Sequence, residues 1–570
     1  MIWLSDKYGL HGDGGSGESQ GDVYEMFFSQ EAYDRSKLSK AEFDILKEAE
    51  DEEKKKKDAA EKKEDNKGAE TNAPKKIEPV KIDLNDIEDR VSRLTLGSAP
   101  IEDALLTSDG ETLVYLVKSE KGYELWSLKL REKELKRLWE FETPKASGRS
   151  PHFPAKIQLD KDGKNVFMLA AGKITKIALA DGKAEPGKFN AEKELDGAAE
   201  RAYLFEHIWR QTREKFYAKD MNGVDWDYYK TVYKKFLPYI SDDRDFSEMT
   251  SEMLGELDAS HTGCRYFPES QNADATAALG AFFDRDYQGN GLRIQEVIKK
   301  GPLITASATI QPGMIIEKIN GIMIDPGMDI SPLLNHLAGQ FTLLTIFDPM
   351  KNTRVDVTVK PISLAEQDEL LYERWVKQRR DLVEKLSNGT VGYVHVRSMD
   401  DQSYRNTYSE ALGRESKKKA LIVDTRFNGG GNLHDTLATF LSGKPYLEFL
   451  PRGQSIGWEP NEKWYRKTVV LISESNYSDA HLFPWVYQHF GIGQLVGMPV
   501  PGTGTSVWWE TLQDPTLIFG IPEVGYRDEQ GHFMEKTQVE PDVKVQNDPK
   551  SIGEGKDQQL EKAVELLMQE

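Results

Sequence analysis

The sequence predicts a multidomain α+β protein in which antiparallel β hairpins, a helical segment, a small β barrel and an α/β part follow one another. At 570 residues the chain is several times longer than an ordinary domain. Its hydrophobic pattern changes from strand periodicity to helix periodicity, back to short strands, and finally to continuous apolar strands alternating with helices. We place the boundaries at these changes: 1–49, 50–79, 80–190, 195–270, 279–362 and 366–570.

The composition excludes several classes of partner and cofactor. A formal net charge of -20 and a pI near 5.2 argue against nucleic acid or an anionic membrane as the main partner. No apolar run is long enough to span a membrane. The N-terminus has no basic region followed by an apolar core, so we expect a cytoplasmic protein, or a periplasmic one if a native N-terminus is missing. The only cysteine, Cys264, allows neither an intrachain disulfide nor a thiolate metal site, and we expect no cofactor and no metal.

The first two segments are unusual. Residues 1–49 begin with a strand and turn, WLSDKYG, which has no earlier strand to pair with, and we expect this strand to be partnerless. Residues 50–79 begin with EDEEKKKKDAAEKKEDNK, which predicts a solvated linker, helical in its first half and disordered after it.

Four apolar runs with Asp-Gly or Lys-Gly turns between them predict antiparallel hairpins over residues 80–190. The runs are TLVYLVKS, YELWSLKL, NVFMLAAG and KITKIAL. Four-stranded units with such turns resemble the blades of a β-propeller, and there is room for one or two. With the first strand unpaired, this pattern predicts the tail of a propeller whose earlier blades are missing.

The remaining segments predict a helical part, a small β barrel and an α/β domain. Apolar and aromatic residues at helical spacing predict amphipathic helices within 195–270. Short strands and one helix around SPLLNHLAG predict a partly open β barrel over 279–362. A long helix ending near residue 386 then precedes the strands GTVGYVHV, ALIVDTR, TVVLISE, QLVGMP and LIFGIP of an α/β domain. Sites in such domains lie at the carboxyl ends of the strands.

Ser478 lies in a turn between a predicted buried strand and an amphipathic helix. A serine at this position can cap the helix, which is the commoner use. It can also act as a nucleophile whose oxyanion is stabilised by free amides at the helix N-terminus, with Asp479 as a natural donor. The spacing alone leaves both roles open.

Three consecutive glycines, 429–431, follow another predicted buried strand, ALIVDTR. They supply a turn, or their bare backbone approaches a ligand at the same sheet edge as Ser478. A phosphate-binding loop is a poorer interpretation, because neither GKS nor GKT follows and no Gly-x-Gly-x-x-Gly spacing is present.

Further candidates are Ser260 and His261, in a loop after a helix, and the acids Glu535 and Glu540 near the last strand. A general base needs only to be close to its nucleophile in space, so the sequence separation is no objection. Most such histidines and acids are nevertheless ordinary surface residues.

Together these segments resemble the tricorn core protease family of serine peptidases, which is related to the tail-specific processing proteases. The similarity covers nearly the whole chain and is carried by FYAKDMNGVDWDYY, ELDASHTG, VGYVHVRSM, DTRFNGGGN, SESNYSDAHLFP, VGMPVPGTG and MEKTQVEPDV. The barrel at 279–362 then resembles a PDZ domain, and the hairpins resemble the end of the family's propeller.

The resemblance implies a Ser-His-Ser-Glu tetrad, with Ser478 as nucleophile, His261 as base, and Ser260 and Glu535 supporting the base. It also implies an oxyanion hole made by the amide of Asp479 and by that of Gly430 or Gly431. The processing proteases use a Ser-Lys dyad instead. Thr503 stands where their pattern has its lysine, and no lysine occurs between Lys467 and Lys536, so the histidine-based subclass is favoured.

We therefore expect a serine endopeptidase acting on unfolded polypeptides or oligopeptides through an acyl-enzyme, and a homo-oligomer is compatible with the resemblance. The main alternative is a catalytically dead PDZ/propeller-type scaffold that binds peptides. An esterase is less favoured, because Ser478 is not in a Gly-x-Ser-x-Gly elbow.

Overall fold

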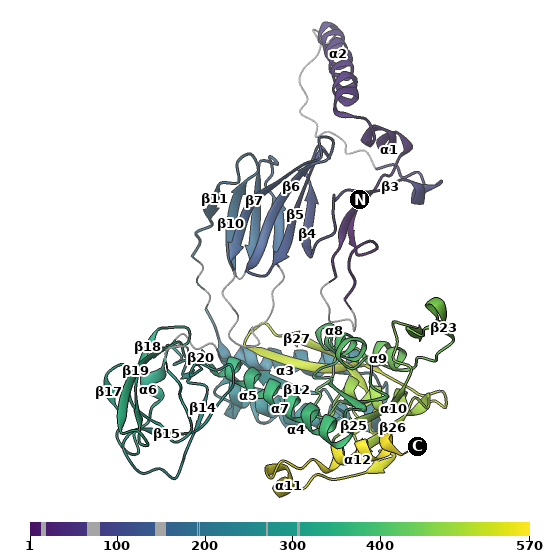
Figure 1. Ribbon diagram of the computed structural model, residues 1–570. Helices are drawn as coiled ribbons and strands as arrows, with labels where there is room; N and C mark the ends of the chain where they lie inside the picture. Colours follow the sequence, from purple (N-terminus) through teal and green to yellow (C-terminus); the bar gives the residue numbers. More distant parts are fainter. Residues whose placement is uncertain are drawn as a thin grey trace. The chain divides into compact units, whose positions relative to one another are not determined.

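The computed structural model describes residues 1–12, 19–64, 80–142, 155–170, 172–190, 192, 194–268, 272–304 and 308–569. The chain forms two compact units, Met1–Tyr203 and Leu204–Glu570 (Figure 1). None of the described helices is long and apolar enough to cross a membrane.

The first unit begins with a three-stranded sheet of β1 (Ile2–Ser5), β2 (Asp22–Met26) and β3 (Val91–Arg93). The expectation of a partnerless first strand is wrong, because β1 pairs antiparallel with β2 along its whole length. The helices α1 (Gln30–Ser36) and α2 (Lys40–Glu64) follow, so the predicted linker is helical in its first half. The half that we expected to be disordered, 65–79, lies outside the described residues.

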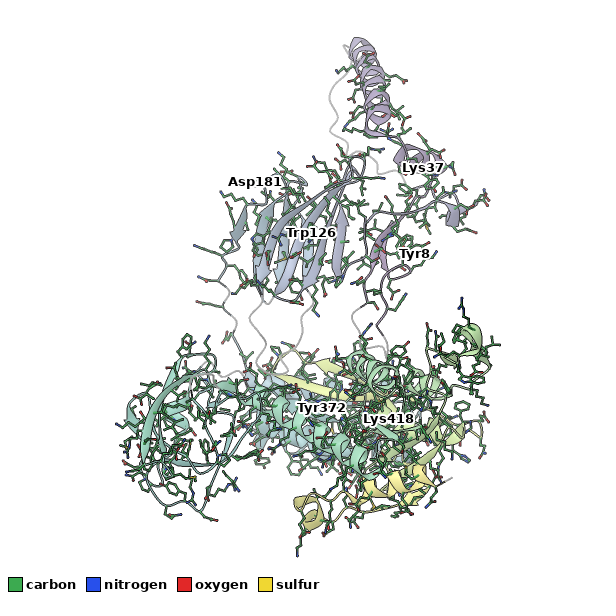
Figure 2. The ribbon with its side chains drawn as sticks, in the orientation of Figure 1. Tyr8, Lys37, Trp126, Asp181, Tyr372 and Lys418 are labelled. Carbon is green, nitrogen blue, oxygen red and sulfur yellow. The ribbon has the colours of Figure 1, made fainter. Side chains whose placement is uncertain are left out.

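Two four-stranded antiparallel sheets make up the rest of this unit (Figure 1). One consists of β4 (Ile101–Leu106), β5 (Thr112–Ser119), β6 (Gly122–Lys129) and β7 (Glu134–Glu142), in that order. The other consists of β8 (Lys156–Leu159), β9 (Asn165–Ala170), β10 (Lys173–Ala178) and β11 (Ala184–Pro186). All four predicted strands of this region are present, as β5, β6, β9 and β10. Trp126 lies on β6 opposite Tyr115 of β5 (Figure 2).

The second unit begins with helices packed on a small sheet. The helices are α3 (Gly197–Lys215), α4 (Trp226–Lys234) and α5 (Asp243–Gly255). The sheet has the order β12 (Gly263–Tyr266), β28 (Leu517–Gly525) and β27 (Thr505–Thr511). We had assigned LIFGIP to the α/β sheet, but it is part of β28, because it pairs antiparallel with both β12 and β27.

Residues 277–363 form antiparallel sheets around a core of their own. The strands are β13 (Ala277–Ala278), β14 (Ala281–Phe283), β15 (Leu292–Val297), β16 (Ile315–Ile319), β17 (Ile322–Met323), β18 (Thr342–Asp348), β19 (Thr353–Val359) and β20 (Ile362–Ser363). The main sheet has the order β14-β15-β16-β18-β19, with β17 paired to β16. The predicted helix around SPLLNHLAG is only one turn, α6 (Ser331–Leu334), because Asn335 is extended and His336 has a φ of 62°.

The C-terminal part is a parallel sheet covered on both faces, as predicted. Its order is β21 (Val391–His395), β22 (Ala420–Asp424), β25 (Lys467–Ile472), β26 (Gln494–Gly497) and β29 (Val543–Lys544). One face packs against α7 (Leu364–Leu386) and α12 (Gln558–Met568). The other packs against α8 (Asp401–Ser409), α9 (His434–Leu441) and α10 (Asp479–His489). Smaller elements are the hairpin β23 (Leu447–Phe449)–β24 (Gly457–Glu459) and α11 (Pro549–Gly553).

Candidate active site

Ser478 is in a strained turn at the N-terminus of α10, directly after the carboxyl end of β25. Its φ of 58° and ψ of -123° are unusual for a residue with a side chain, and its hydroxyl makes no capping hydrogen bond. The capping role that the sequence left open is therefore not the role in this structure. The backbone N–H of Ser478 donates to Thr503 Oγ1 at 2.8 Å. Strain held by neighbouring contacts is typical of functional turns.

The turn is fixed to the neighbouring strand by Asn476, which is almost fully buried. Its Oδ1 accepts from the amide and hydroxyl of Ser473, and its Nδ2 donates to Thr425 Oγ1 at 3.1 Å. The loops after β22 and β25 are thereby joined at one edge of the sheet.

The glycine run lies directly against Ser478. A Cβ on Gly430, whose φ is 100°, would come within 2.6 Å of Ser478 Cβ. A Cβ on Gly431, whose φ is 146°, would lie 2.0 Å from the carbonyl oxygen of Met399. Real Cβ atoms do not approach so closely, so both positions require glycine for this packing.

The two glycines differ as oxyanion donors. The N–H of Gly430 donates to Asn428 Oδ1 at 2.8 Å and is therefore engaged in this structure. Within the described part of the chain, no hydrogen-bond acceptor is recorded for the N–H of Gly431 or for that of Asp479. Of the amides that we predicted for an oxyanion hole, Gly431 and Asp479 are thus the ones available to a ligand.

The side chain of Asp479 faces away from this role and fixes the start of α9. Its buried carboxylate accepts hydrogen bonds from the amides of Leu433 and His434 and from His434 Nδ1. Burial alone would lower the pKa of His434, but the Asp479 carboxylate outweighs this effect and raises it. The pair locks α10 and the glycine loop together.

His261 lies in the loop between α5 and β12, as predicted, and also has a left-handed backbone with a φ of 63°. Its Nδ1 is 2.7 Å from Ser260 Oγ and 3.0 Å from Thr505 Oγ1. The hydroxyl of Ser260 donates to Glu535 Oε2 at 2.9 Å, and the Ser260 amide donates to Glu535 Oε1 at 2.6 Å. The structure therefore brings Ser260, His261 and Glu535 together, and it leaves Glu540 exposed in a contact with Gln538.

Burial governs the pKa values of the titratable groups in this hydrogen-bonded series. Burial, followed by the positive charge of Arg265, lowers the pKa of His261 to about 4. Burial raises the pKa of Glu535, and the hydrogen bonds from Ser260 oppose that rise. The imidazole is thus neutral at physiological pH, which is the form in which a histidine can accept a proton.

Tyr477 connects His261 to the turn that carries Ser478. Its hydroxyl accepts from the backbone N–H of His261 at 2.7 Å, and its ring centroid is 4.7 Å from that of the imidazole. No hydrogen bond joins Ser478 Oγ to His261 among the described residues, and the Nε2 of His261 has no protein partner there. Sequence reasoning missed Tyr477 and Thr505; adjacency to Ser478 was the only signal for the first, and nothing in the sequence marked the second.

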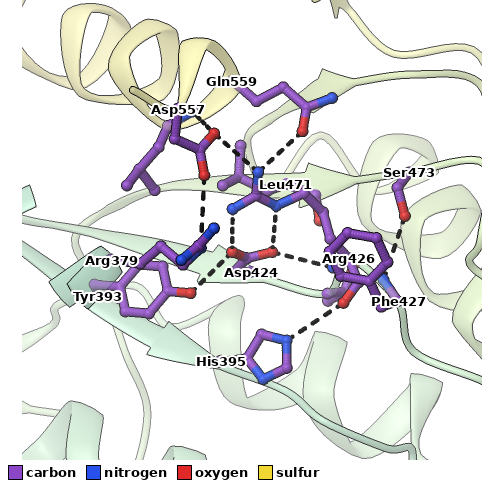
Figure 3. Close-up of polar contacts among 12 residues, drawn as sticks. Arg379, Tyr393, His395, Asp424, Arg426, Phe427, Leu471, Ser473, Asp557 and Gln559 are labelled. Atoms are coloured by element: carbon purple, nitrogen blue, oxygen red, sulfur yellow. Dashed lines mark hydrogen bonds and ion pairs between the residues drawn. The ribbon is translucent and has the colours of Figure 1, made fainter. Parts of the chain in front are cut away.

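A buried ionic network surrounds Arg426, which lies three residues before the glycine run (Figure 3). Arg426, two residues after the end of β22, donates from Nε and Nη2 to both oxygens of Asp424, and its Nη1 donates to Asp557 Oδ1 and Gln559 Oε1. Burial would lower the pKa of Arg426, but the charge of Asp424 outweighs it and raises that pKa. The network joins the loop to the start of α12.

The carbonyl of Arg426 also lies 3.3 Å from His395 Nε2. The other ring nitrogen of His395 lies 2.9 Å from the hydroxyl of Tyr372, which is on α7 (Figure 2). A neutral His395 satisfies both contacts, with Nε2 donating and Nδ1 accepting. Burial lowers the pKa of His395, which favours that neutral form.

Two family models match this chain. The model of peptidase family S41 matches residues 390–545, and the tricorn protease C1 domain matches residues 198–255. Tricorn protease homolog 1 of Streptomyces coelicolor is 28% identical over 440 residues, which is 74% of this chain and 40% of that protein. The tricorn protease of Thermoplasma acidophilum is 24% identical over 505 residues, which is 86% of this chain and 46% of that protein.

The fold agrees with these matches. A crystal structure of the tricorn protease superimposes with a TM-score of 0.72 at 19% identity, over 86% of this chain and 49% of that one. Residues 390–545 are therefore similar to the peptidases of family S41. Together with the C1 domain match and the curated relatives, the similarity is to the tricorn proteases. The chain spans less than half the length of the relatives named above.

Proposed function

We propose that the chain is an endopeptidase that cleaves unfolded polypeptides or oligopeptides through an acyl-enzyme on Ser478. The observation that carries this proposal is the hydrogen-bonded series Glu535–Ser260–His261, which ends beside the strained turn of Ser478. Nδ1 of His261 is occupied, so Nε2 is the nitrogen left to act on the nucleophile.

In the proposed reaction, His261 Nε2 takes the proton of Ser478 as Oγ attacks the peptide carbonyl. The resulting oxyanion is stabilised by the amides of Asp479 and Gly431. The proton then passes to the leaving amine, the C–N bond breaks, and a water molecule activated by His261 hydrolyses the acyl-enzyme. Glu535 acts through Ser260 by stabilising the imidazolium that forms in between.

Three finer assignments accompany this proposal. Residues 279–362 are assigned as a PDZ-like domain and residues 80–190 as propeller-like hairpins, supported by their antiparallel four- and six-stranded sheets. A homo-oligomeric assembly is proposed by analogy with the family.

The direct test is hydrolysis of an internally quenched peptide library by the whole chain. Ser478→Ala should abolish cleavage while leaving the melting curve nearly unchanged, and His261→Ala should cost about 10⁴-fold or more in kcat. A Ser478→Ala protein that keeps more than a tenth of the parent rate would refute the assignment. A parent that binds peptides but never cleaves them would instead support the scaffold alternative.

A further inference from the structure

Thr505 is the first residue of β27 and reaches the base from a strand far away in the sequence. β12 and β27 both pair antiparallel with β28, so they run in the same direction, with β12 beginning opposite Gly520 and β27 beginning opposite Gly525. His261 lies two residues before β12. The sheet thus brings Thr505 to the imidazole, where only 2% of the threonine is exposed.

Two glycines before β27 let this strand approach the segment that carries Glu535. A Cβ on Gly504 would lie 2.4 Å from Met534 Cβ, and a Cβ on Gly502 would lie 2.2 Å from the amide nitrogen of Thr537. Any side chain at either position would push the two segments apart. The close packing therefore brings the start of β27 next to the segment that carries Glu535.

The hydroxyl of Thr505 contacts both the imidazole of His261 and the hydroxyl of Ser260. Its Oγ1 is 3.0 Å from His261 Nδ1 and 3.2 Å from Ser260 Oγ. Thr505 is also among the groups that lower the pKa of Glu535 against the effect of burial. Each hydroxyl can accept from Nδ1–H, and the hydroxyl of Thr505 can donate to that of Ser260, which in turn donates to Glu535.

We propose that Thr505 is a second positioning residue for His261, which gives Nδ1 a second hydroxyl acceptor beside the one that links it to Glu535 through Ser260. Either hydroxyl would then hold the imidazole in the tautomer that leaves Nε2 able to accept a proton. This tautomer would lose its support only when both hydroxyls are removed. The kinetic consequence of this inference rests on the proposed function. The contact between Thr505 and the imidazole does not depend on that function.

The test is a double-mutant cycle of Ser260→Ala and Thr505→Val in the full chain. Thr505→Val keeps the shape of the side chain and should lower kcat/KM about fivefold, as for the loss of one neutral hydrogen bond. The double variant should lose at least about tenfold more than the product of the two single losses, because no hydroxyl remains for Nδ1. Thr505→Ser should recover most of the loss, and Thr511→Val, near the far end of β27, should behave like the parent.

A second readout does not depend on turnover. In protein labelled with ¹⁵N-histidine, the His261 signal should titrate at lower pH in Thr505→Val than in the parent, because the imidazolium loses a hydrogen-bond acceptor. Thr505→Ala serves the same purpose if the valine variant does not fold.

Multiplicative losses in the cycle, together with an unmoved His261 titration, would overturn the inference. A parent without peptidase activity would refute the proposed function, and the titration would still decide whether Thr505 supports the imidazole.

Discussion

The imidazole of His261 is buried beside a cation, and this environment sets the pH range in which it can accept a proton. A lowered pKa of about 4 means that the ring loses its proton already in acidic solution. We predict that the acid limb of kcat/KM lies near pH 4, well below the ~6.5 of an unperturbed histidine, and that activity is lost only as the pH falls through that limb.

A substitution of Arg265 provides the control for this prediction. Its positive charge contributes to the lowering, so Arg265→Gln should move the acid limb of kcat/KM to higher pH. An acid limb near pH 6.5 that does not move in Arg265→Gln would show that burial does not set the pKa of His261.

The two acids near the C-terminal strand should differ sharply. Glu535 is buried and bonded twice to Ser260, whereas Glu540 is exposed and contacts Gln538. Glu535→Gln should lower kcat, because the imidazolium is less stabilised, and Glu540→Gln should be nearly neutral in the same peptide assay. The opposite ranking would mean that the wrong carboxylate has been assigned.

The glycine loop and the turn before α10 pack directly against each other. Gly430→Ala would press a methyl group against Ser478, and we expect kcat/KM to fall by about a hundredfold or more, as for other displacements of about 1 Å at a reacting group. Gly429→Ala is the matched comparison, since a Cβ there meets no atom within 4 Å and φ is not left-handed. Equal losses in the two variants would show that contact with Ser478 is not what matters.

The buried ionic network around Arg426 should contribute to the free energy of unfolding as well as to kcat. Arg426→Leu leaves Asp424 buried without its cation and should cost about 3–5 kcal/mol of unfolding free energy, together with a fall in kcat as the loop loses its anchor on α12. Arg354→Leu removes a surface arginine paired with Glu317 and should cost about 1 kcal/mol or less. Denaturant titrations that give similar losses for both variants would contradict this view of the network.

At the scale of the whole molecule, stability should be concentrated in the parallel sheet. Every residue of β22 is buried, whereas β9 exposes Phe167 and Leu169 on alternate positions. We predict that amides of β22 and β25 exchange with deuterium most slowly and that those of β8–β11 exchange much earlier. Uniform protection across both units would contradict this distribution.

Local patterns in the sequence predicted much of this architecture, and their failures have physical reasons. Continuous apolar strands such as ALIVD predicted a sheet covered on both faces, and the turn before α10 predicted where Ser478 lies. LIFGIP was misassigned because its apolar run is the same in a parallel strand and in an antiparallel one. The sequence did not indicate a role for Thr505, because its contact with His261 depends on strand pairing and on the glycines that allow β27 to pack closely. Neither feature can be recognised from the threonine itself.

The site of covalent labelling by a fluorophosphonate tests directly whether Ser478 is the nucleophile. We predict a single adduct on Ser478, found by mass spectrometry of the digested protein, formed faster as the pH rises above about 4 and greatly slowed by His261→Ala. An unlabelled Ser478 in folded protein, or an adduct on another residue that survives Ser478→Ala, would contradict the account.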